Sequence, residues 1–292
     1  MLVILLAVIV ALGWGASDYF GGDTSGRDLP VFTTVALAEL IGMALMVPVL
    51  AVHGTLPPAD PGLALAAAAG VAVTVELSLI YRALSNGQAF ITAPVGALGA
   101  AIAVSAGLIG GDPLSLTIAA GLVLALAGGA ISSWTSPGRT GRRAPVRTAA
   151  ICLTAAAGVA TALTCLHAAG RVDPYWAAFT EHASTGVSAG LIALTLERRP
   201  SRRSGRSSQP GRLGRRHLAG LAIIALTGLG GDLGYTIASQ HGSLSILAAI
   251  SSLYPITTIT LALLLKGTRP TRTQLAGITL ALLGTALLSL TH

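Results

Sequence analysis

Five acidic residues lie in otherwise apolar stretches of the chain and are the side chains best placed to do chemistry. They are Asp18, Glu39, Glu76, Glu181 and Asp232. An ionised carboxylate at the centre of a lipid bilayer costs about 2.5–3.5 kcal/mol, so such a group must face a cavity, find a partner or be protonated. We interpret these acids as groups that bind a cationic solute group or a proton. The structural alternative is that each acid pairs with Arg82, Arg171 or a backbone group.

The spacing of two of these acids coincides with an internal repeat. Glu76 and Asp232 are 156 positions apart, and the same offset lays residues 121–133 on residues 277–289 with seven identities in thirteen positions. Glu39 and Glu181 are expected at similar depths in matching parts of the two halves. This symmetric placement predicts that both halves direct acids into one shared space.

Five aromatic residues are candidates for the walls of that space, where they could stack on a solute: Trp14, Tyr81, Trp176, Tyr235 and Tyr254. The alternative is that they anchor helix ends at the membrane interface. His182 follows Glu181, but neighbouring helical residues point in different directions, which disfavours a relay between the two. No group of His, Cys and acidic residues has metal-ligand spacing, so neither a metal nor another cofactor is expected.

These side chains must be positioned by membrane-spanning helices, because the composition excludes the other classes. The chain is 53% hydrophobic and only 10% charged, whereas a soluble domain has about 25% charged residues. The apolar content excludes disorder, and two cysteines are too few for a disulfide scaffold. The uncharged runs exceed the roughly 20 residues that span a bilayer. They are continuous rather than alternating, which favours helices over a membrane barrel.

Turn signals divide the chain into ten predicted transmembrane helices, so the expected fold class is an all-α integral membrane protein. The expected ranges are 2–20, 31–52, 62–84, 88–109, 115–134, 148–169, 174–196, 218–239, 243–265 and 271–290. Pro48, Pro94 and Pro255 fall inside spans and are expected to kink them. The first span has no basic residue before its apolar run, so we interpret it as a retained helix rather than a cleaved signal peptide.

The repeat divides the chain into two five-helix halves, residues 1–134 and 148–292, joined by a basic linker at 135–147. A half with an odd number of spans leaves the membrane on the side opposite its entry. The second half is therefore expected upside down relative to the first. Inverted repeats of this kind recur in transporters, which bind substrate near the midplane between the halves.

Several short motifs resemble those of one family. They lie at residues 14–15, 81–84, 244–255, 267–270 and 274–277. Together they resemble the EamA repeat of the drug/metabolite transporter superfamily, as two copies that cover essentially the whole chain. The resemblance implies a ten-helix carrier of small metabolites, often an exporter. The chain departs from the family at Asp112 and Thr268, where family members often have Glu, and the Leu-x-Pro element at 253–255 has no clean partner in the first half.

Arginine supplies 17 of the 18 basic residues and is concentrated in segments 139–147 and 198–216. Because these segments flank predicted spans and contain no aromatic residue, we interpret them as loops beside anionic lipid rather than as a nucleic-acid site. The positive-inside rule then places both chain termini outside the cytoplasm. The family resemblance implies termini inside, so the two indications disagree, and the charge asymmetry favours the first.

The expected function is secondary-active transport, as an exporter, of small metabolites such as amino acids or related polar or amphipathic solutes by alternating access. A multidrug or lipophilic-cation exporter is the alternative, followed by a non-transporting membrane subunit and a membrane-embedded enzyme. The sequence has no GxxxxGK[ST] loop, so ATP is not the expected energy source. We expect no enzyme activity and a location in the cell membrane, the inner membrane in a bacterium. A homodimer is left open.

Overall fold

A computed structural model describes residues 2–27, 29–86, 92–132, 145–197, 214–266 and 272–289, and all secondary structure in these residues is helical. The first half contains α1 (Leu2–Arg27), α2 (Val31–His53), a 3-10 turn η1 (Pro61–Leu63), α3 (Ala64–Ser85), α4 (Thr92–Ile109) and α5 (Leu116–Ser132). The second half contains α6 (Pro145–Val172), α7 (Pro174–Ile192), a π-helical turn η3 (Ala193–Glu197), α8 (Arg215–Ser239), α9 (Leu244–Ser251), α10 (Tyr254–Lys266) and α11 (Arg272–Ser289).

Six segments of the described chain are long and apolar enough to cross a bilayer. They are Leu2–Ser25, Val31–His53, Pro61–Ser85, Leu153–Val172, Arg215–Ser239 and Leu244–Leu265. Two shorter apolar helices, Leu98–Ile109 and Leu116–Gly128, accompany them. The prediction of an all-α membrane protein is therefore confirmed for the residues that the structure describes.

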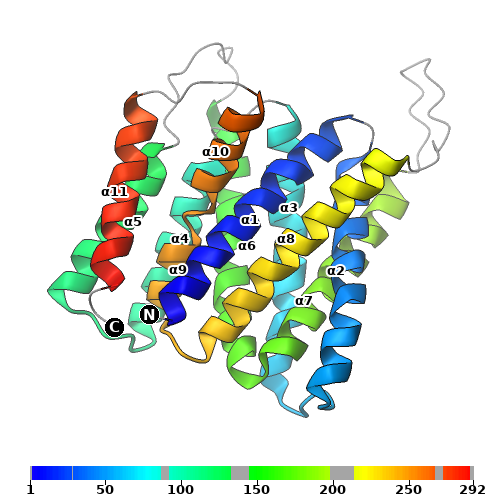
Figure 1. Cartoon of the computed structure of the whole chain (residues 1–292), viewed down its shortest axis with the longest axis horizontal. Helices are drawn as coiled ribbons and strands as arrows, with labels where there is room; N and C mark the ends of the chain where they lie inside the picture. Colours follow the sequence, from blue (N-terminus) through cyan, green and yellow to red (C-terminus); the bar gives the residue numbers. More distant parts are fainter. Residues whose placement is uncertain are drawn as a thin grey trace.

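The helices stand side by side in one bundle (Figure 1). The α5–α11 pair lies at one end and the α2–α7 pair at the other, with α1, α3, α6 and α8 between them. Helix α1 packs along α8, and α3 packs along α6. The two chain ends lie at the same face of the bundle.

Glycines allow the closest helix contacts, as is common where helices pack inside a membrane. A Cβ atom on Gly284 of α11 would lie 2.4 Å from the backbone nitrogen of Ala125 in α5. A Cβ atom on Gly13 of α1 would lie 2.6 Å from the Thr227 carbonyl oxygen in α8. Any larger residue at these positions would force the paired helices apart.

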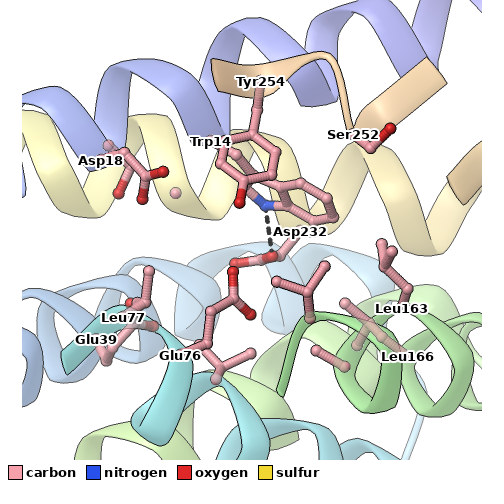
Figure 2. Close-up of a pocket in the computed structure, with 15 residues that line it drawn as sticks. Trp14, Asp18, Glu39, Glu76, Leu77, Leu163, Leu166, Asp232, Ser252 and Tyr254 are labelled. Carbon is pink, nitrogen blue, oxygen red and sulfur yellow. Dashed lines mark hydrogen bonds between the residues drawn. The ribbon is translucent and has the colours of Figure 1, made fainter. Parts of the chain in front are cut away.

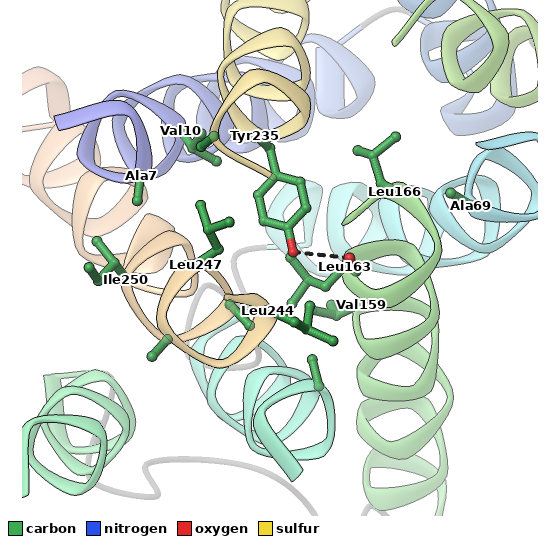
Figure 3. Packing of buried hydrophobic residues seen from close by; sticks show 14 of the residues in the cluster. Ala7, Val10, Ala69, Val159, Leu163, Leu166, Tyr235, Leu244, Leu247 and Ile250 are labelled. Carbon is green, nitrogen blue, oxygen red and sulfur yellow. Dashed lines mark hydrogen bonds between the residues drawn. The ribbon is translucent and has the colours of Figure 1, made fainter. Parts of the chain in front are cut away.

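Helix α9 is the most enclosed element, since all eight of its residues are buried. Leu244, Leu247 and Ile250 of α9 pack into a core formed with α1, α6 and α8 (Figure 3). The Tyr235 hydroxyl of α8 donates a hydrogen bond to the Leu163 carbonyl of α6 at 3.0 Å in the same core. Helix α9 is thus enclosed by packing against α1, α6 and α8.

The predicted span at 243–265 is interrupted in its middle. Helix α9 ends at Ser251 and α10 begins at Tyr254. Pro255 explains the interruption, because proline has no N–H to donate and its ring would clash with the carbonyl four residues earlier, that of Ser251. The kink expected at Pro255 is therefore a complete break, whereas Pro48 lies inside a continuous α2.

Four acids outside the apolar stretches accept hydrogen bonds from backbone N–H groups at helix starts. Asp173 accepts from the backbone N–H groups of Tyr175 and Trp176 at the start of α7. Asp60 accepts from the backbone N–H of Gly62 in η1. Asp112 accepts from the backbone N–H of Ser245 at the start of α9, 2.8 Å away. Glu197 accepts from the backbone of Phe32 and Thr33 at the start of α2. These acids therefore have structural partners, unlike several of those inside the bundle.

Candidate functional site

The centre of the bundle contains a cavity of about 60 Å³. Because one water molecule needs roughly 10–15 Å³ of such space, the cavity has room for about four waters in this conformation. Its lining comes from both halves of the chain: Trp14, Ser17, Asp18, Glu39, Val73, Glu76, Leu77, Val159, Ala162, Leu163, Leu166, Gly228, Asp232, Ser252 and Tyr254. Four of these residues carry carboxylates, so the cavity is acidic.

His182 of α7 contacts carboxylates on two other helices, α2 and α8. Its Nδ1 atom lies 2.5 Å from Glu39 Oε2 on α2, a hydrogen-bond contact. Its Nε2 atom lies 3.3 Å from Asp232 Oδ2 on α8, an ion-pair contact without hydrogen-bond geometry. A protonated imidazole would offset one negative charge between these two acids.

Asp232 has a second partner across the α1–α8 interface. The Trp14 indole nitrogen donates a hydrogen bond to Asp232 Oδ1 at 2.8 Å (Figure 2). Gly231 makes this contact possible, since a Cβ atom there would lie 2.4 Å from Trp14 Cδ1. The Trp14 ring also packs against Tyr235, with ring centroids 5.4 Å apart.

Asp18 and Glu76 differ from the other cavity acids. Neither has a hydrogen bond or an ion pair with any other residue in the described part of the chain, and Asp18 is only 3% exposed. The Tyr254 hydroxyl is buried and also without a partner among those residues. Figure 2 shows the Glu76 carboxylate and the Tyr254 hydroxyl directed toward the same space around Asp232 and Trp14. Buried polar groups usually have partners, so Asp18 and Tyr254 are candidates to bind a solute, together with the half-buried Glu76 in the same lining.

Glu181 lies beside this network rather than in the cavity lining. Its Oε1 atom accepts a hydrogen bond from the Thr185 hydroxyl at 2.6 Å, and its Oε2 atom is 3.8 Å from His182 Nδ1. Glu39, Glu181 and His182 place ligand-type atoms within 4.8 Å of one another, a grouping that could hold a metal ion. However, the 2.5 Å contact between His182 and Glu39 is shorter than the spacing of about 3 Å between neighbouring ligands of one zinc ion. In this structure the contact between His182 and Glu39 is a hydrogen bond.

The predicted site residues fall into three groups. Six line the cavity: Trp14, Asp18, Glu39, Glu76, Asp232 and Tyr254. Three lie next to it: Glu181 in contact with His182, Tyr81 at 3.3 Å from the cavity residue Ser17, and Tyr235 behind Trp14. The structure does not bring Trp176 to the cavity; its indole nitrogen donates to the Thr55 carbonyl near the start of α7.

The structural alternative of pairing with Arg82 or Arg171 is not observed, since every ion pair within the described residues uses a histidine. Sequence reasoning missed the central position of His182. Its contacts with Glu39 and Asp232 join three helices and leave no spacing signal, although a base next to the predicted acid Glu181 could have been a hint. Ser17 and Ser252 were missed for the same reason.

An apolar helical bundle with an acidic cavity at its centre defines a polytopic membrane protein with an internal polar site. Residues 1–134 and 147–290 match the EamA-like transporter family, so the chain belongs to that family, and the resemblance drawn from its motifs is confirmed. A solved structure described only as a crystal structure of a protein is similar, with a TM-score of 0.77, 18% identity and 99% coverage of both chains. This likeness shows a shared fold. No match was found among curated proteins.

Proposed function

We propose that the protein is a secondary-active transporter that carries a small polar or amphipathic metabolite, such as an amino acid, through the central cavity by alternating access. The observation that carries the proposal is the cavity itself, which holds four carboxylates inside an apolar bundle. Such groups are costly in a membrane and usually belong to solute or proton pathways. Membership of a transporter family supports the same conclusion.

The proposed architecture is ten spans in two inverted five-helix repeats. In this scheme α1, α2, α3, α4 and α5 correspond to α6, α7, α8, the α9–α10 pair and α11. Exchanging the halves turns the α1–α8 contact into the α6–α3 contact, and both are extensive in the bundle. The α2–α7 and α5–α11 contacts map onto themselves. This pattern is what a pseudo-two-fold axis through the bundle would produce.

The position of the cavity also supports transport between two such halves. Its polar lining comes from α1, α2 and α3 of the first half and from α8, Ser252 and Tyr254 of the second. Interrupted helices at mid-membrane are typical of transporter binding sites, since the broken backbone can line a cavity. Ser252 lies in the break and Tyr254 begins α10, and both line this cavity.

His182 provides a means to couple solute movement to protons. It contacts acids on α2 and α8, so loading or removing a proton in this network changes the attraction between those helices. A solute that competes for Glu39 or Asp232 would alter the same contacts. The driving force would then be a proton or solute gradient.

The direction in the membrane follows from the charges at the two faces. Arg82 at the end of α3, Arg215 and Arg216 at the start of α8 and Arg272 at the start of α11 lie at the face opposite the chain ends, whereas Arg171 lies at the other. By the positive-inside rule the arginine-rich face is cytoplasmic, in the cell membrane, which is the inner membrane in a bacterium. Of the basic segments, 135–144 and 198–213 lie outside the described residues, and contact of 198–216 with anionic lipid remains part of the proposal.

A multidrug or lipophilic-cation exporter is the second candidate function. It is favoured by the excess of carboxylates over bases in the cavity and by the Trp14 ring beside them, since aromatic faces attract cations. Competition between a lipophilic cation and amino acids for transport distinguishes the two candidates.

Reconstitution in liposomes tests the proposed function. When a proton gradient is imposed, wild-type protein should transport a metabolite from a defined mixture across the membrane. Glu39→Gln and Glu181→Gln should reduce the rate of this transport or its dependence on pH. Asp60→Asn is a matched control, because Asp60 is exposed and does not line the cavity. Absence of solute flux from correctly inserted protein would reject a carrier.

A further inference from the structure

The four cavity acids form two classes, and only one class has a basic or hydrogen-bond-donating partner in the described part of the protein. Glu39 and Asp232 both contact His182, and Asp232 also accepts the Trp14 N–H. Neither Asp18 nor Glu76 takes part in an ion pair or a side-chain hydrogen bond among the described residues, and Asp18 Oδ2 is buried without a partner there. This difference suggests that the two classes have different roles, and that the acids without partners bind the solute.

We propose that Asp18, Glu76 and the Tyr254 hydroxyl form a subsite for the primary ammonium group of an organic amine with a small apolar body. This inference rests on the proposed function and names the class of solute that the transporter carries. Asp18 and Tyr254 are each 3% exposed, line the cavity, and keep an oxygen atom without a partner in the described structure. A buried carboxylate in this situation is stable only when it is protonated or when a cation occupies the space beside it.

The chemistry of the subsite selects an ammonium group that carries hydrogens. Carboxylate oxygens act as acceptors when ionised, and a tyrosine hydroxyl can accept as well as donate. A primary ammonium offers three N–H donors for these three groups, whereas a quaternary ammonium offers none. Charge-assisted hydrogen bonds of this type are about twice as strong as neutral ones. The subsite therefore distinguishes a primary amine from a permanently charged lipophilic cation.

The other walls of the cavity fit the rest of such a solute. Val159, Leu163 and Leu166 of α6, together with Leu77 of α3, add aliphatic side chains to the cavity lining. The Trp14 ring lies beside the acids and can contact a cation through its face. No arginine or lysine lines the cavity, so a solute carboxylate has no basic partner among its lining residues. Among the solutes that the proposed function covers, the lining therefore favours a simple amine over a zwitterionic amino acid.

Binding to wild-type-like protein tests this inference without altering the subsite. Of the three tryptophans, Trp134 and Trp176 can be changed to Phe, which leaves Trp14 as the fluorescence reporter in the cavity. The probes are propylamine, whose four non-hydrogen atoms match the room for about four waters, its N-trimethyl derivative and the neutral 1-propanol. We expect the amine to bind at least about tenfold more tightly than either of the others, as charged hydrogen bonds imply. Equal affinities for the three probes would overturn the inference.

Variants then locate the subsite. Asp18→Asn, Glu76→Gln and Tyr254→Phe should each weaken amine binding and leave binding of the alcohol unchanged, while Asp60→Asn should alter neither. Thermal unfolding midpoints identify any variant that fails to fold, and the comparison of probes on the unaltered subsite decides the question in that case. Amine affinity that is unaffected in all three folded variants would contradict the assignment.

The outcome is separable from that of the proposed function. Solute flux in liposomes without selective amine binding would support the proposed transporter and contradict the amine subsite. Selective amine binding without flux of any solute would keep the subsite and reject the transporter.

Discussion

His182 Nδ1 lies 2.5 Å from Glu39 Oε2, and this buried contact ties α7 in the second half to α2 in the first. Both side chains are almost fully enclosed, with 1% and 7% of their surface exposed. The same imidazole reaches Asp232 on α8 through its other nitrogen. One base thus contacts acids on two neighbouring helices, α2 and α8. Its removal should therefore affect both the stability of the protein and transport.

Replacing His182 by Gln should therefore destabilise the protein strongly. Removing one member of a buried ion pair costs about 3–5 kcal/mol because the remaining charge has no partner. We expect a lower thermal unfolding midpoint in detergent and a loss of pH-dependent transport. His53→Gln is the matched control, since His53 pairs with Asp173 in a more exposed position, where such pairs contribute about 0–1 kcal/mol. Similar destabilisation by the two variants would show that the His182 network is not special.

Gly42→Ala should displace His182 without removing any charged group. A Cβ atom at position 42 would lie 2.9 Å from His182 Nδ1, and the enclosed imidazole has little room to move. Overpacking of this kind costs about 1–3 kcal/mol. Gly230→Ala in α8 should be harmless, because nothing lies within 4 Å of its added Cβ. Transport rates of the two alanine variants provide the check, and a Gly42→Ala rate equal to that of Gly230→Ala would contradict the geometry.

Trp14→Phe should weaken the function of Asp232 while keeping an aromatic ring in the cavity. It removes the indole N–H that donates to Asp232 Oδ1, and a hydrogen bond to a charged group contributes about 1.5–3 kcal/mol. We expect a reduced transport rate with altered pH dependence. Trp176→Phe, which loses a hydrogen bond to Thr55 away from the cavity, should leave both unchanged. The pH profile is the readout, and a profile like that of wild type would argue against a role for the indole.

Pro255→Ala tests whether the break between α9 and α10 is needed. Alanine would remove the cost of about 3 kcal/mol that proline imposes inside a helix, so a continuous α9–α10 helix becomes possible and the protein should still fold. Transport should fall, because Ser252 and Tyr254 would leave their positions in the cavity lining. Pro48→Ala is the control, since that proline lies within a continuous helix. Full activity of Pro255→Ala would mean that the break serves no function.

The sequence could predict those parts of the site that depend on local composition. Apolar runs identified the helices, and the charge cost of a membrane acid singled out Asp18, Glu76 and Asp232, all of which line the cavity. The aromatic residues were less separable: Trp14 and Trp176 look alike in sequence, but only Trp14 faces the cavity. Local composition does not determine which side of a helix meets the centre of a bundle when both sides are apolar.

His182 and the α9–α10 break show two further reasons for failure. The importance of His182 depends on contacts with Glu39 and Asp232, which are 143 and 50 positions away in the chain. Pro255 did signal a disturbance, but proline inside α2 causes no break. A proline in an apolar run therefore does not by itself predict whether the helix continues or ends.

Access to the cavity from the two sides of the membrane tests the central claim most directly. Ser252→Cys can be introduced into protein whose two native cysteines, Cys152 and Cys165, are replaced by Ala. A membrane-impermeant thiol reagent is then applied to oriented vesicles from one side at a time. Alternating access predicts that Ser252→Cys is labelled from either side, and that each fully labelled population loses transport. Labelling from one side only, or from neither while transport continues, would contradict the account.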